Sequence, residues 1–112
     1  MVTRAMELVV VEIQVDSNGN VIVSRNPNVP KLIGGQHHVQ FRSNNPNTVI
    51  VYTETSPFDV ADLPVGKTLP LGRSGEGPFK VVNEGQQNHF DCGEFDAAGN
   101  FSKWGGGGNT PT

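Results

Sequence analysis

Residues 8–24 have the sequence LVVVEIQVDSNGNVIVS, in which two apolar stretches flank a short polar one. In the first stretch, Val9, Val11 and Ile13 recur at every second position, which is the period of a β-strand. The polar stretch at 16–20 contains Gly and Asn, which tolerate the positive φ angles of a tight hairpin turn. The sequence therefore predicts an antiparallel hairpin over residues 8–24.

The same alternation continues along the rest of the chain. Val39 and Phe41 alternate with polar residues, and an Asn-rich turn follows at 44–47. Residues 48–53 are β-branched or aromatic, which suits a central strand covered on both faces. Alternation resumes at Phe90-Asp91-Cys92, and no stretch has a sustained helical period. Strands at intervals of about 8–12 residues, with turns between them, predict an all-β sandwich.

Length and composition indicate one domain. The chain has 112 residues with 14 Gly and 8 Pro, which is enough for one core and implies many turns. We expect a single β-sandwich domain over residues 1–104. Residues 105–112, with the sequence GGGGNTPT, are expected by composition to form a flexible tail. The net charge of -3 and the scattered Lys and Arg residues argue against a nucleic-acid partner.

Compartment and membrane association are constrained by the same features. A single cysteine cannot form an internal disulfide, which favours a reducing compartment. The apolar run Leu8–Val11 is too short for the core of a signal peptide and is interrupted by Glu12. No segment approaches the roughly 20 apolar residues that a membrane span requires. We therefore expect a soluble protein, with the cytoplasm favoured over secretion.

The order of these features resembles the cupredoxin (plastocyanin-like) family of Greek-key β-sandwiches. The resemblance spans roughly residues 8–104 and depends on Val39-Gln-Phe41, the Asn-rich turn leading into Val49–Tyr52, and Phe90-x-Cys92 near the end. It is closest to small bacterial members that lack the copper ligands. An immunoglobulin-like sandwich would give a similar pattern and is the alternative fold.

The copper site implied by this family is absent from the sequence. A blue-copper centre uses two imidazoles and one thiolate, usually with a distant Met. Cys92 matches the thiolate, but Thr48 and Val49 stand where the family has its first His, and Phe95 stands where it has the second. No His or Met follows Cys92. We therefore expect no copper and no other cofactor.

A different metal site is the alternative, because the chain still has three histidines and one thiol. His37 and His38 are adjacent and would point to opposite faces of a strand, so only one could join Cys92 and His89. The alternative site is therefore His38, or His37 in its place, with His89 and Cys92, in a metal-binding or electron-transfer protein. The main expectation is surface histidines and a buried structural thiol.

No catalytic residues are predicted. Asp91 and Glu94 beside Cys92 would disfavour a reactive thiolate. The Gly-rich stretch 72–77 lacks the Lys-Ser/Thr of a phosphate loop, and no Gly-x-Ser-x-Gly elbow occurs. The sequence favours a non-catalytic binding or structural module, because irregular loops usually carry binding residues. Its expected partner is a protein or a second copy of the chain in a larger assembly, contacted through the two termini.

Overall fold

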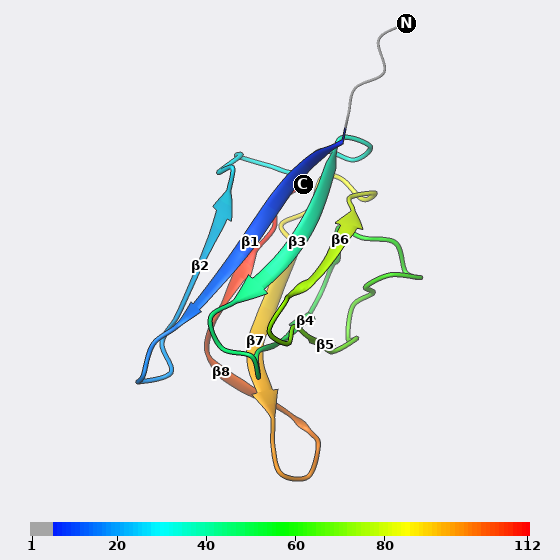
Figure 1. Cartoon of the computed structure of the whole chain (residues 1–112). Coiled ribbons are helices and arrows are strands. Elements are labelled where there is room, and N and C mark those ends of the chain that lie inside the picture. Colours follow the sequence, from blue (N-terminus) through cyan, green and yellow to red (C-terminus); the bar gives the residue numbers. More distant parts are fainter. Residues whose placement is uncertain (1–5) are drawn as a thin grey trace, which may run out of the picture.

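The computed structural model describes residues 6–112, and the chain folds there into two packed β-sheets. The strand order is β2-β1-β3-β6 in one sheet and β5-β4-β7-β8 in the other (Figure 1). Within the described residues all regular structure is β, so the all-β prediction is confirmed. The strands are β1 (Glu7–Val15), β2 (Val21–Asn26), β3 (His37–Ser43), β4 (Val49–Tyr52), β5 (Leu69–Pro70), β6 (Glu76–Lys80), β7 (His89–Phe95) and β8 (Phe101–Asn109).

Residues 6–112 contain no helix with the length and apolar character that crossing a membrane requires.

The predicted N-terminal hairpin is present, and Asp16 organises its turn. β1 and β2 pair antiparallel with Val15 opposite Val21. The Asp16 carboxylate accepts hydrogen bonds from the backbone N–H groups of Asn18 (2.8 Å) and Asn20 (2.9 Å). The bond from Asn20 is the main reason that the pKa of Asp16 lies below its usual value. These hydrogen bonds within residues 16–20 explain why this short polar stretch forms a turn without contacts from the rest of the chain.

β1 and β4 occupy internal positions in their sheets, as the sequence of residues 48–53 predicted for β4. β1 lies between β2 and β3, antiparallel to the first and parallel to the second. β4 lies between β5 and β7, and Val49, Ile50 and Tyr52 of this strand are buried. At such an internal position both edges of the strand are hydrogen-bonded to neighbours, so an apolar strand such as β4 exposes no unpaired backbone.

The core lies between the inner faces of the two sheets. The ring of Phe41 on β3 meets Phe58 and Phe90 edge to face, with centroid distances of 6.0 and 5.9 Å. Phe58 comes from loop 53–68, so this long loop is anchored inside the sandwich. The other buried apolar residues of the core are Val9, Val11, Ile13, Leu32, Val39, Ile50, Tyr52, Leu63, Leu71, Val81 and Cys92. Aromatic edge-to-face pairs of this kind add to the stabilisation that burial provides.

Residues 105–112 do not form the expected flexible tail. The glycine run is the second half of β8, which pairs with β7 up to Asn109. A Cβ on Gly108 would lie 2.9 Å from Val23 Cγ1 of β2 and 2.8 Å from Phe90 Cζ. A Cβ on Gly107 would overlap the carbonyl oxygen of Phe90 on β7. The glycines are therefore needed for close packing, which a reading of composition alone does not detect.

The residues after β8 are also fixed by their own chain. Thr110 and Thr112 are buried, and the Tyr52 hydroxyl lies 2.7 Å from Thr110 Oγ1. The Asn88 amide nitrogen donates to Thr110 O (2.9 Å) and to Thr112 Oγ1 (3.0 Å). The backbone N–H of Thr112 donates to Gln86 O (2.8 Å). Contacts within the chain thus account for the order of this segment, without a partner.

Two glycine substitutions test the packing of β8. Gly107→Ala should lower the free energy of unfolding by about 1–3 kcal/mol, because the new methyl group meets the Phe90 carbonyl. Gly105→Ala is the matched control, since no atom lies within 4 Å of its Cβ position and its φ is not positive. Its effect should be neutral or stabilising by up to about 1 kcal/mol. Urea unfolding followed by the fluorescence of Trp104 measures both, and equal stabilities of the two variants would contradict close packing at Gly107.

Candidate functional site

The residues of the alternative metal site lie in three different places. Cys92 points into the core from β7, and His89 lies on the opposite face of the same strand with 48% of its side chain exposed. His38 is on the outer face of β3, in the other sheet. Among residues 6–112, no three His, Cys, Asp or Glu side chains are grouped so that they could hold a metal ion. The geometry gives this alternative no support.

His37 is buried, so the expectation that the histidines lie on the surface is wrong for this residue. Only 2% of it is exposed, and it shares the inner face of β3 with Val39. Its Nδ1 accepts a hydrogen bond from the backbone N–H of Ile33 (2.8 Å), which leaves the ring proton on Nε2, 3.1 Å from Glu7 Oε2. Both nitrogens have partners, so His37 fixes the entry into β3 and offers no free ligand atom.

Cys92 has no exposed surface, as its alternation with Phe90 predicted. Burial raises the pKa of its thiol to about 12, with the charge of Asp91 adding to the effect. The reactive form of cysteine is the thiolate, which a raised pKa and exclusion of solvent both suppress. Cys92 is therefore suited to packing in the core and not to nucleophilic attack or metal ligation.

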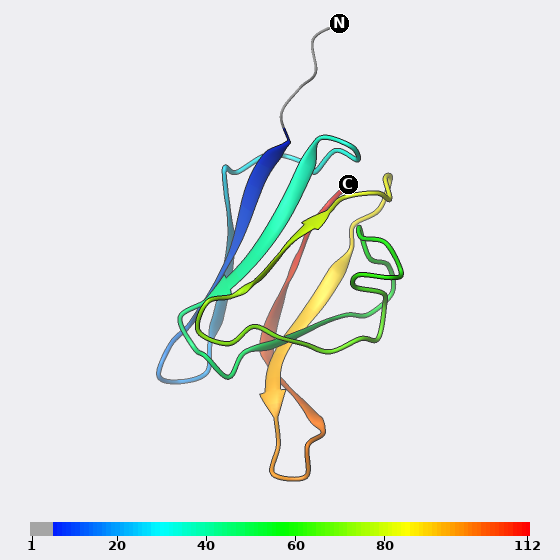
Figure 2. The same cartoon turned by 45° about the vertical axis from the view of Figure 1, so that its right-hand side comes forward.

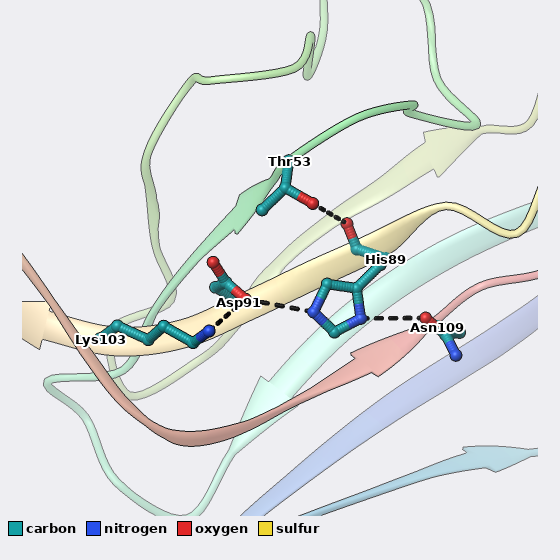
Figure 3. Close-up of polar contacts among 5 residues, drawn as sticks. All are labelled: Thr53, His89, Asp91, Lys103 and Asn109. Carbon is teal, nitrogen blue, oxygen red and sulfur yellow. Dashed lines mark hydrogen bonds and ion pairs between the residues drawn. The ribbon is translucent and has the colours of Figure 1, made fainter.

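A polar cluster lies on the outer face of β7 and β8 (Figure 3). His89 Nε2 is 3.1 Å from Asp91 Oδ1, and its Nδ1 is 3.0 Å from Asn109 Oδ1. The Lys103 ammonium lies 3.5 Å from the same Asp91 oxygen. The spacing of two along β7 places His89 and Asp91 on one face, and β8 places Asn109 directly opposite His89. Gly107 lacks a side chain there, which leaves room for the imidazole.

This cluster lacks the parts that catalysis or metal binding would need. Each imidazole nitrogen faces a side-chain oxygen, of Asn109 or of Asp91, and a neutral ring can donate its single N–H to only one of them. The nearby Thr53 hydroxyl donates to the backbone carbonyl of His89 (3.4 Å) and does not face the ring. One imidazole and one carboxylate fall short of the usual three protein ligands. From the sequence, His89 was expected beside Cys92, whereas its neighbour on the same face of β7 is Asp91, which the spacing of two residues could have indicated.

A groove of about 400 Å³ lies between loop 53–68 and loop 81–88, and we call it the loop groove. Figure 2 shows these two loops beside each other at the same side of the molecule. Phe58 forms part of the lining, and Val60 and Val65 lie on the groove with 79% and 43% of their surface exposed. Gln86 also lines it, and its Oε1 is buried with no hydrogen-bond partner. The groove thus combines exposed apolar groups with an unused acceptor.

Hydrogen bonds between the two loops hold the groove open in one shape. The Asn83 amide nitrogen donates to Ser56 O (2.9 Å) and to Phe58 O (3.2 Å). Ser56 Oγ donates to Leu63 O (2.6 Å) across its own loop. Residues 59–63 form a single turn, closed by the hydrogen bond from Leu63 N to Asp59 O (3.1 Å). The loop groove is therefore largely formed before any ligand arrives.

Comparisons with protein-family models, with curated proteins and with solved structures found no match for this chain. No relative therefore supplies a ligand or a residue role. The loop groove is the candidate site, because it alone among the places described above combines volume, exposed apolar surface and an unpartnered polar atom.

The burial of Cys92 is tested by its reactivity. The native thiol should react with Ellman's reagent about 100-fold or more slowly than the thiol of the urea-unfolded chain, because solvent and thiolate are both excluded. Rapid stoichiometric labelling of the native protein would contradict this.

The raised pKa of Cys92 also predicts a dependence of stability on pH. The unfolded thiol, with an ordinary pKa of 9.0, loses its proton before the folded one, whose pKa is about 12. Deprotonation of the unfolded state stabilises that state, so stability falls as pH rises from about 9 to about 12. Cys92→Ala should lack this component of the fall, which urea titrations of both proteins across that range would measure. Parallel pH profiles for the two proteins would be inconsistent with a raised pKa.

Proposed function

We propose that this chain is a non-catalytic protein-binding module whose loop groove receives an apolar side chain of the partner. The observation that supports this most directly is the exposure of Val60 and Val65 beside Phe58 around a preformed groove. Apolar groups gathered at a concave surface favour association, since a partner side chain removes them from water. A volume of about 400 Å³ suits an anchoring side chain together with its neighbours.

The polar atoms of the loop groove indicate the chemistry of this partner. The Oε1 atom of Gln86 is a buried acceptor without a donor, and Glu54, whose carboxylate carries further acceptors, lines the same groove. A partner segment that supplies N–H donors next to an apolar side chain would satisfy both. The partner can be another protein or a second copy of this chain.

We also propose that the two sheets form a cupredoxin-like sandwich. The parallel pairing of β1 with β3 and the order β2-β1-β3-β6 support a Greek-key, cupredoxin-like sandwich. An immunoglobulin constant-type sandwich groups its first, second, fourth and fifth strands in one sheet. Here the first, second, third and sixth strands share a sheet, which favours the cupredoxin-like alternative. With Cys92 enclosed in the core, the fold would serve as a scaffold for loops.

Photo-crosslinking from the loop groove tests the proposal. A photoreactive phenylalanine analogue at position 60 should form crosslinked products in extracts of cells that make the protein. The same analogue at position 98, an exposed site in the turn between β7 and β8, is the matched control. Val65→Asp should reduce the position-60 products about tenfold, because it places a charge on the apolar rim. Mass spectrometry then shows whether the product contains a second copy or another protein.

Two outcomes would contradict the proposal. One is that position 60 yields no more product than position 98. The other is that Val65→Asp leaves the yield unchanged, since the crosslinks would then not depend on the apolar surface of the loop groove.

A further inference from the structure

A second cavity lies between β2 and β8, where the edges of the two sheets face each other, and we call it the Arg25 cavity. Its volume is about 530 Å³, and it is separate from the loop groove. The residues that matter for its chemistry are Ser24, Arg25, Asn28, Gly107, Gly108 and Asn109. Nothing in the proposed binding function uses it.

The cavity lies at the position on β2 where a charged residue, Arg25, follows two valines on the same face. Alternation along β2 places Val21, Val23 and Arg25 on one face, toward β8. Val21 and Val23 pack against Gly106 and Gly108, closely enough that a Cβ on either glycine would touch them. Arg25 is the next residue on this face of β2, and its side chain is charged where a valine would continue the apolar contact. The cavity lies at this position.

The guanidinium of Arg25 is held in place without a counter-ion. Its Nη1 donates to Asn109 O (3.0 Å) and its Nη2 donates to Val29 O (3.2 Å). Its Nε is buried with no hydrogen-bond partner. The ion pairs found among residues 6–112 join His37 to Glu7, and His89 and Lys103 to Asp91, so none of them involves Arg25. A fixed, half-buried cation therefore keeps both charge and N–H groups unused.

These features match the needs of a carboxylate. A guanidinium binds a carboxylate through paired N–H donors, and partial burial strengthens the attraction. Asn28 and Asn109 line the same cavity, and their side-chain amides can supply further donors. Gly107 and Gly108 contribute no side chains, which leaves space and allows a ligand to approach the backbone. The volume lies within the range of small-molecule sites, about 300–1,000 Å³.

We propose that the Arg25 cavity binds a carboxylate group, with Arg25 as its charged anchor and the exposed Asn28 in its lining. The group can belong to a small organic acid or to an acidic residue of a peptide. A purely structural role of Arg25, in which it only joins β2 to β8 through the Asn109 carbonyl, is the competing explanation.

Nuclear magnetic resonance titration with defined probes separates the two explanations. Acetate and succinate represent small acids, and the blocked peptide acetyl-Gly-Asp-Gly-amide represents a peptide carboxylate. Acetamide, and sodium chloride at matched ionic strength, are the uncharged and salt controls. The resonances to follow are the Nε–H of Arg25 and the backbone amides of Gly107, Gly108 and Asn109. We expect saturable shifts at these groups with at least one carboxylate probe and none with acetamide, and the tighter probe identifies the source.

Three variants establish which residues bind. Arg25→Gln should abolish the saturable shifts, whereas Arg42→Gln should retain them, because Arg42 is an exposed arginine of β3 outside the cavity. Asn28→Asp should weaken binding about tenfold or more by placing a competing carboxylate beside Arg25. Asn28 is exposed, so this variant decides the question if Arg25→Gln does not fold.

The proposal is overturned if no carboxylate probe gives saturable shifts at the Arg25 cavity, or if sodium chloride reproduces the same shifts. It is also overturned if folded Arg25→Gln or Asn28→Asp binds as tightly as the unaltered protein. These failures would leave the loop groove and its crosslinks unaffected, so the two proposals stand or fall separately.

Discussion

The close approach of β8 to its neighbours is the constraint on which much of the structure depends. Gly107 lies against the backbone of β7, while Gly106 and Gly108 pack against Val21 and Val23 of β2. β8 therefore does two things at once, because it extends one sheet by hydrogen bonding and contacts the edge of the other by packing. Side chains at these positions would force the strand away from either β7 or β2.

Several other features follow from the position of this strand. Its glycine at 107 leaves the outer face open for the His89 imidazole, and its last residue, Asn109, bonds both to that imidazole and to Arg25. The residues beyond it reach Tyr52 and Asn88 at the end of the sandwich. The polar cluster, the Arg25 cavity and the ordered C-terminal residues thus share one structural origin.

The sequence predicted the elements whose signals are local. Period-two alternation and the Asp16 turn were sufficient for the hairpin of β1 and β2, and the apolar run at 48–53 marked a central strand. The prediction for residues 105–112 was wrong, because glycine is equally frequent in flexible chains and in close contacts. Only the partners of the glycines, which are distant in sequence, distinguish these cases. His37 was misplaced for the same reason, since its partner Glu7 lies thirty residues away.

The parallel pairing of β1 with β3 has a consequence for how the chain reaches this structure. Glu7 pairs with His37, which is thirty residues later in the chain. The intervening segment, which contains β2 and the loop after it, must therefore form a closed loop before β1 and β3 can pair. β3 then pairs with β6, so its second neighbour is also remote in sequence. Folds dominated by such distant pairings have a high contact order and form slowly, in milliseconds to seconds. Until both pairings exist, the unpaired edges of β1 and β3 can hydrogen-bond to strands of other molecules. The longer the chain remains in this state, the more it is prone to aggregate.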